Sequence, residues 1–107
     1  MFKPEIKNDF YIIRVEGQDA SIDINNVSEL KKLLKEGIEQ GYKKIIVDFK
    51  NISYIDSSGL GCLMDSMKEL KNKGGELGIL SISSDVLEVF TATKIGQFFK
   101  YYKSIGA

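Results

Sequence analysis

The residues best suited to chemistry lie together in "IDSSGLG", residues 55–61, where one carboxylate precedes two hydroxyls and two glycines. A serine hydroxyl is a possible nucleophile, so Asp56 and Ser57 could belong to the site of a small hydrolase or transferase. Nucleophilic sites of the Ser-His-Asp and Cys-His types need an imidazole, however, and the chain contains no histidine. An enzyme built on this pair would need an unusual base, such as a lysine with a lowered pKa.

The same run is also a favourable start for a helix, because Asp and Ser side chains accept hydrogen bonds from the free amides of a first turn. One such cap contributes about 1 kcal/mol, and residue chemistry alone favours this structural interpretation. The run nevertheless supplies more polar groups than a cap requires, and Gly59 and Gly61 keep the surface low enough for another protein to approach. A helix N-terminus also accommodates a phosphate group, so a phosphorylated serine is compatible with this position.

The sequence matches poorly with two other kinds of site, a nucleotide-binding loop and a phospho-acceptor aspartate. "SSGLG" lacks both the GxGxxG fingerprint and the lysine of a P-loop, so it does not predict a nucleotide site. A receiver domain with a phospho-acceptor aspartate would need an acidic pair after its first strand and a lysine after a late strand. "RVEGQD" and "LSIS" do not provide them. We therefore expect no cofactor and no catalytic residue.

Composition limits the classes of protein to which the chain can belong. Its 107 residues, 43% of them apolar, suit one domain, and fifteen basic residues balance fifteen acidic ones. This balance argues against direct binding of nucleic acid or of a membrane surface. The single cysteine, Cys62, cannot form an internal disulfide or complete a usual zinc site, and it is interpreted as a small core residue. The N-terminus lacks the apolar segment of a secretory signal, so a cytoplasmic protein without a metal is expected.

The elements that must position residues 55–61 are strands alternating with helices. Residues 2–7 and 10–16 predict a hairpin whose first strand, containing Pro4, lies at a sheet edge. Asn25, Asn26 or Ser28 could begin the first helix, and Ser83 or Ser84 the third. The later elements are predicted as a helix over 27–38 ended by Gly41, a strand in "KKIIVDF", a helix through 60–70 ended by Gly74-Gly75, a strand in "ELGILSI", a helix through 86–90 and a strand in "FFKYY".

This order predicts a single α/β domain with a mixed, mostly parallel sheet, an N-terminal antiparallel hairpin and flanking helices. Ligands of such sheets bind beyond the carboxyl ends of the parallel strands. Residues 55–61 follow "IIVDF" and a short extended passage, "KNISYI", so we expect them near that rim.

A family resemblance adds to this interpretation. "IDSSGLG" after a strand resembles the signature of the STAS domain of anti-sigma factor antagonists. The similarity continues through "IIRVEG", "SIDINNVSELKKLL", "KKIIVDFKNISYIDSSGLGCLM" and "GGELGILSISSDVLEVFTATKIGQFFKYY", which implies one STAS domain over residues 1–107. Two features depart from the family: Lys94 stands where glycine is common, and "KSIGA" is too short for the closing helix of many members, so a thin layer is expected on one sheet face.

The resemblance implies a protein switch and not an enzyme. Family members bind an anti-sigma factor that is also a serine kinase, and so release a sigma factor. The kinase then phosphorylates the first hydroxyl of the motif, here Ser57 in preference to Ser58, and a serine phosphatase restores binding. The free protein is expected to be a monomer. The resemblance implies partner contacts by Asp23, Asp56, Ser57, Ser58, Gly59 and Gly61.

Two points stay open at this stage. The acid of the family's loop aligns best with Asp23, but Asp19 is an alternative. A different STAS role is also open, either as a subunit of a stress-sensing assembly or as a nucleotide-sensing module.

Overall fold

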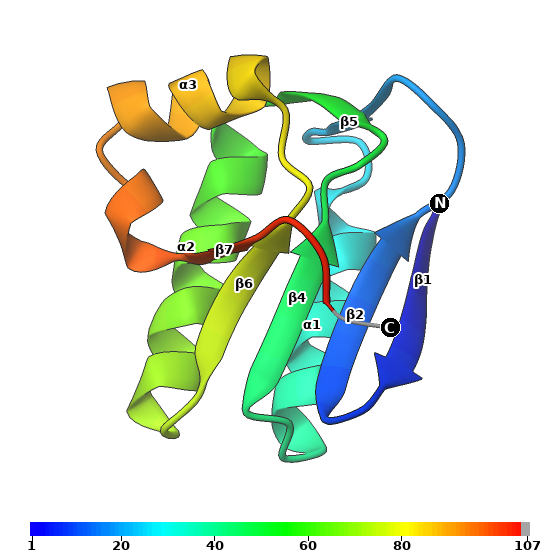
Figure 1. The fold of residues 1–107 in the computed structure, drawn as a ribbon, viewed down its shortest axis with the longest axis vertical. Coiled ribbons are helices and arrows are strands. Elements are labelled where there is room, and N and C mark those ends of the chain that lie inside the picture. Colours follow the sequence, from blue (N-terminus) through cyan, green and yellow to red (C-terminus); the bar gives the residue numbers. More distant parts are fainter. Residues whose placement is uncertain (106–107) are drawn as a thin grey trace.

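A five-stranded mixed sheet forms the centre of the protein in a computed structural model, which describes residues 1–105 (Figure 1). The strand order is β1-β2-β4-β6-β7, with β1 and β2 antiparallel and the other neighbours parallel. The predicted fold class and the edge position of the first strand are therefore confirmed. The strands are β1 (Phe2–Lys7), β2 (Phe10–Val15), β4 (Lys44–Asp48), β6 (Glu76–Leu80) and β7 (Lys100–Tyr102).

The two long helices, α1 (Val27–Glu39) and α2 (Ser57–Asn72), lie side by side on one face of the sheet (Figure 1). Their apolar stripes pack against the alternate strand residues that point to this face, and the resulting core is almost fully buried. Its members include Leu34, Leu63, Leu70, Ile45, Val47 and Ile79. A shorter helix, α3 (Ser84–Ala92), packs on β5 (Ile52–Ile55) at one end of the sheet (Figure 1).

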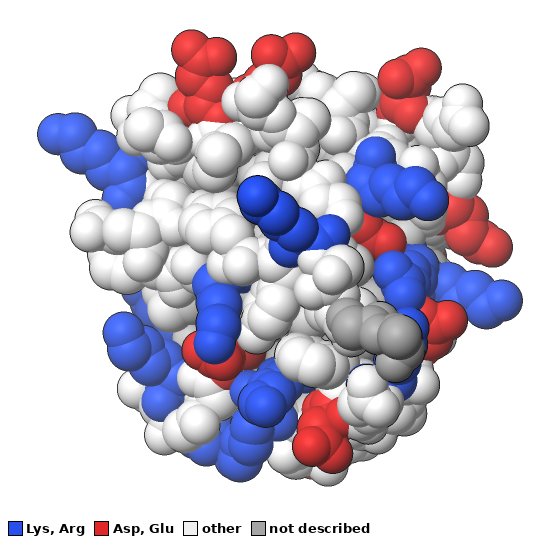
Figure 2. All heavy atoms as spheres, in the orientation of Figure 1, with Lys and Arg blue, Asp and Glu red and all other residues white. Residues whose placement is uncertain are grey.

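The opposite face of the sheet carries the thin layer expected from the sequence. Within residues 1–105 no helix covers it, and the final segment of the chain crosses it instead (Figure 1). Tyr102 packs edge-on against Phe10, with ring centroids 5.7 Å apart. Gly78 makes room for this ring, since a Cβ there would lie 2.6 Å from Tyr102. Basic and acidic side chains are interspersed over the same side of the molecule (Figure 2).

A second, two-stranded parallel sheet was not anticipated from the sequence. It pairs β3 (Ala20–Ile22) with β5, and the register shifts between Ala20 and Ser21. β3 has only three residues and lies in a polar loop, so its strand conformation depends on a partner about thirty residues further along the chain. The last strand is also shorter than predicted, because Gly96–Phe98 form a 3-10 turn, η1, before β7 begins.

Most of the predicted helix ends are confirmed. Asn26 is the N-cap residue of α1, although its side chain makes no capping hydrogen bond. Gly41 adopts a positive φ of 91° just after α1, as a helix-stopping glycine should. At α3 the Ser83 hydroxyl accepts a hydrogen bond from the amide of Val86 at 3.2 Å.

Lys94 adopts the left-handed conformation that glycine most often supplies after a helix. Its φ is +64°, and it follows α3 in a Schellman motif, in which the Ile95 amide donates to the Phe90 carbonyl and the Lys94 amide to that of Thr91. The turn therefore forms without a glycine. A left-handed conformation costs a residue with a Cβ about 1–2 kcal/mol. Glycine avoids this cost but loses more backbone entropy on folding, which cancels part of the gain.

We expect Lys94→Gly to raise the free energy of unfolding by about 0.5 kcal/mol, the difference between those two effects. Urea unfolding would measure it. Lys94→Ala removes the same charge but keeps the Cβ, so it should give no gain. An equal gain in both variants would contradict the explanation based on backbone conformation.

Candidate functional site

The site is organised by the carboxylate of Asp56, the N-cap residue of α2. One oxygen accepts hydrogen bonds from the Ser58 hydroxyl at 2.5 Å and from the Gly59 amide at 3.1 Å. The other accepts from the amide of Ile24, in the loop after β3, at 3.1 Å. The Ser58 hydroxyl contributes most to a lowered pKa of Asp56, followed by the amides of Gly59 and Ile24, so the carboxylate is held in its charged form.

The two serines of the motif have different environments. Ser58 is partly buried, and its hydroxyl is occupied by Asp56. Ser57 is the first residue of α2, is exposed, and its hydroxyl makes no hydrogen bond to any described residue. A modifying enzyme could therefore reach the Ser57 oxygen without breaking a hydrogen bond among the described residues.

The two glycines of the motif also differ. Gly59 is buried, and a Cβ there would lie 2.8 Å from side-chain carbons of both Ile22 and Ile55. Its role in the structure is close packing of α2 against β3 and β5. Gly61 is exposed, and a Cβ added to it would meet nothing within 4 Å, so it lowers the helix surface beside Ser57 without a packing requirement.

The fold separates the two alternative loop acids. β3 runs parallel to β5, so Asp23, just after β3, lies at the same end as Asp56, just after β5. Asp19 precedes β3 and lies by the opposite end of β5, in a pocket that Lys50 also lines. Asp23 accepts the Ser21 hydroxyl at 2.6 Å and the Asn25 amide at 2.9 Å, which fixes the loop next to the site.

Ile24 was not singled out by the sequence interpretation. It follows Asp23, its amide binds Asp56, and its side chain is 71% exposed. The sequence feature that could have pointed to Ile24 is its position as an isolated apolar residue among the polar residues of "DINN". An exposed isoleucine whose amide binds Asp56, the residue before Ser57, is suited to contact another protein.

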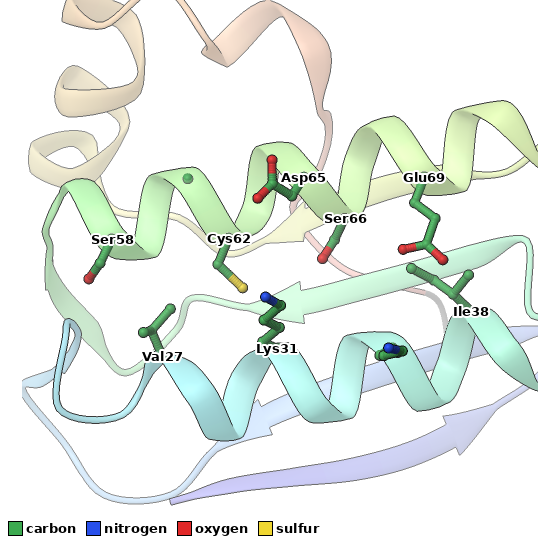
Figure 3. Close-up of a pocket in the computed structure, with 10 residues that line it drawn as sticks. Val27, Lys31, Ile38, Ser58, Cys62, Asp65, Ser66 and Glu69 are labelled. Carbon is green, nitrogen blue, oxygen red and sulfur yellow. The ribbon is translucent and has the colours of Figure 1, made fainter.

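A groove of about 420 Å³ between α1 and α2 begins at Ser58 and runs away from the site (Figure 3). Cys62 lines it on α2 and faces Lys31 on α1 (Figure 3). Burial raises the pKa of the Cys62 thiol above its usual value, outweighing the opposing effect of Lys31. The thiol is only 8% exposed and belongs to the core, which agrees with the interpretation of Cys62 as a packing residue.

Within residues 1–105, no group of three or more acidic or cysteine side chains is placed to hold a metal ion. The same residues form no helix that is long and apolar enough to cross a membrane.

A family model for the STAS domain matches residues 2–107. The chain belongs to the STAS domain family. The anti-sigma-B factor antagonist of Staphylococcus aureus (strain NCTC 8325 / PS 47) is 34% identical to this STAS domain over 84 residues, which cover 78% of this chain and 75% of that protein. The protein of the same name from Staphylococcus epidermidis is 33% identical over 86 residues, covering 80% and 77%.

Solved structures agree with the family assignment. The anti-sigma factor antagonist SpoIIAA in its unphosphorylated form matches with a TM-score of 0.73 and 26% identity, over 98% of this chain and 90% of that one. The phosphorylated form of SpoIIAA, a Bacillus cell fate determinant, matches with a TM-score of 0.72 and 25% identity, over 97% and 93%. This STAS domain is thus similar to a protein solved in both phosphorylation states.

We expect Gly59→Ala to lower the free energy of unfolding by about 1–3 kcal/mol, because the new methyl group must displace Ile22 and Ile55. Gly61→Ala is the matched control on the same helix and should raise it by up to about 1 kcal/mol through helix propensity. Urea unfolding of both variants measures the difference. Equal effects would contradict the distinction between a packed and an open glycine.

The lowered pKa of Asp56 predicts a pH-dependent contribution to stability. A carboxyl with a lowered pKa in the folded state stabilises the fold above the ordinary Asp value, 3.8, and loses this effect as the pH falls through its own pKa. Asp56→Ala should therefore be less stable than wild type at pH 7, and the gap should narrow toward pH 3, as judged by urea unfolding.

Asp65→Ala is the control for that experiment, since Asp65 is an exposed carboxylate of α2 that makes no hydrogen bond or ion pair with described residues. It should show no comparable gap. A gap for Asp56→Ala that stays constant or widens in acid would contradict the assigned role of the Asp56 carboxylate.

Proposed function

We propose that this STAS domain is an anti-sigma factor antagonist, switched off by phosphorylation of Ser57. In this proposal the domain binds an anti-sigma factor that is also a serine kinase, and the binding releases a sigma factor. The names of its relatives support the general role. The observation that carries the specific switch is the exposed, unbonded hydroxyl of Ser57 at the first position of α2.

A phosphate on Ser57 would change the surface and leave the fold in place. Phosphorylation adds about 1.5 to 2 negative charges at pH 7. The helix N-terminus tolerates this charge, because its free amides and partial positive charge face it. A partner surface matched to a neutral hydroxyl does not tolerate the added charge. Binding would require removal of water from the phosphate, and acidic side chains of the partner would repel it. A few kcal/mol suffice, since each 1.4 kcal/mol changes affinity about tenfold.

The proposed docking surface combines the loop after β3 with the start of α2. Asp56 joins the two segments, and Asp23 stiffens the loop. Ser57 and Gly61 provide the exposed, low surface, and Ile24 adds an apolar contact. Ser58 and Gly59 support this surface from within the domain. Ser58 donates a hydrogen bond to Asp56, and Gly59 allows close packing of α2 against β3 and β5.

The same geometry argues against a hydrolase or transferase at this position. Asp56 accepts the hydroxyl of Ser58, whereas the Ser57 hydroxyl makes no hydrogen bond to a described carboxylate or amine. A nucleophile activated by its neighbour would need that bond. We therefore propose a non-enzymatic protein. The proposal also includes a cytoplasmic location, a monomeric free state and a separate serine phosphatase that restores the unmodified protein.

Phosphate transfer tests the proposal directly. The protein is incubated with ATP and each candidate anti-sigma kinase of its own genome, and mass spectrometry locates the phosphate. We expect phosphate on Ser57 of the wild type, none on Ser57→Ala, and phosphate still on Ser57 in Ser58→Ala. Transfer to another residue, or to none with every candidate kinase, would overturn the switch.

Charge mimicry tests the consequence of the modification. Ser57→Glu should weaken the complex with the anti-sigma factor at least tenfold, measured by calorimetry, because a carboxylate must be desolvated at the contact. Its melting temperature and circular dichroism should stay close to wild type, since the exposed Ser57 side chain makes no hydrogen bond with a described residue. A complex of unchanged affinity, or an unfolded variant, would contradict the proposal.

A further inference from the structure

A second groove lies on the other flank of α2, between that helix and η1. It has a volume of about 380 Å³, and Met64, Met67 and Phe98 form its apolar part. Phe98 is 45% exposed, an unusual position for a phenylalanine that could have turned inward as Phe99 does. Methionine side chains adapt to irregular partners and are frequent at binding surfaces.

Both charged residues that line this α2–η1 groove are lysines, Lys68 and Lys71. Their spacing of three residues places them on neighbouring positions of the helix surface. Within residues 1–105 neither ammonium group has a carboxylate within 4 Å, whereas nearby Lys73 pairs with Glu69 and Lys100 with Glu76. The groove is therefore apolar inside and positively charged at its edge, and no ion pair with a described carboxylate neutralises its two lysines.

We propose that the α2–η1 groove docks an acidic amphipathic helix of the anti-sigma factor. The apolar stripe of such a helix fills the space between Met64 and Phe98, and its carboxylates neutralise Lys68 and Lys71. The proposal rests on the function proposed above, and it assigns the partner's segment by charge complementarity.

The groove is continuous with the Ser57 surface along α2. Leu60, Met64 and Lys68 follow one another at intervals of four residues and so lie on one side of the helix. Eleven residues at 1.5 Å rise place Lys68 about 16 Å from Ser57, within the span of one ordinary interface. A partner can thus contact Ser57 and the α2–η1 groove at the same time.

A defined peptide tests the groove without the partner. The probe is a fluorescent 18-residue helical peptide with a leucine stripe flanked by glutamates, and its counterpart carries lysines in their place. Anisotropy should show that the wild-type protein binds the glutamate peptide at least tenfold more tightly than the lysine peptide. Phe98→Ser, which changes an exposed side chain and needs no refolding, should weaken this binding.

Charge reversal on two helices supplies the matched comparison. Lys68→Glu with Lys71→Glu should lose at least tenfold in affinity for the glutamate peptide. Lys32→Glu with Lys35→Glu, two exposed lysines at the same spacing on α1, should keep it. Equal losses in the two double variants would overturn the proposal, as would binding to phosphatidylserine vesicles in the absence of binding to the peptide.

The kinase assay separates this inference from the proposed function. Lys68→Glu with Lys71→Glu should raise the KM for phosphorylation of Ser57 at least tenfold, with kcat little changed. A wild-type KM in this variant would overturn the docking role and leave the switch at Ser57 intact. A protein that no anti-sigma kinase binds or phosphorylates would overturn the proposed function, while selective binding of the glutamate peptide would still support an acidic ligand for the groove.

Discussion

The candidate site depends on one carboxylate that joins two parts of the chain distant in sequence. Asp56 accepts hydrogen bonds from its own helix, through Ser58 and Gly59, and from the loop after β3, through Ile24. Hydrogen bonds to a charged acceptor are stronger than bonds between neutral groups, and here they also lower the pKa of the accepting carboxyl, Asp56. The start of α2 and the β3 loop are therefore held as one unit.

This arrangement is compatible with the switch proposed at Ser57. The polar groups that maintain the fold, on Asp56 and Ser58, are occupied by each other and by amides. The hydroxyl left over belongs to Ser57, and it is exposed. A change of charge there breaks no hydrogen bond among the described residues, so most of its free-energy effect is expected on whatever binds the surface. In the switch proposed above, regulation and folding would therefore use adjacent residues without interfering.

The hairpin, the central strand and the two long helices were predictable because they rest on local patterns. The hairpin, the apolar run of β4, and the stripes of α1 and α2 are all visible in the sequence, and each of these elements is found. The pairing of β3 with β5 was not predicted, because three residues in a polar loop carry no strand pattern of their own. The turn at Lys94 also depended on context, since a lysine adopted a conformation for which sequence rules name glycine.

The sequence by itself determined the elements, their order and the position of an acid and two hydroxyls before a helix, because periodicity and capping preferences act over a few residues. It could not say which of Asp19 and Asp23 lies at the same end of the small sheet as Asp56, which of Gly59 and Gly61 is packed against strands, or which serine hydroxyl is bonded to Asp56. Only the tertiary structure decided these points. Each depends on what a distant segment, the loop after β3 or the strand β5, places against the start of α2, and such contacts leave no local pattern.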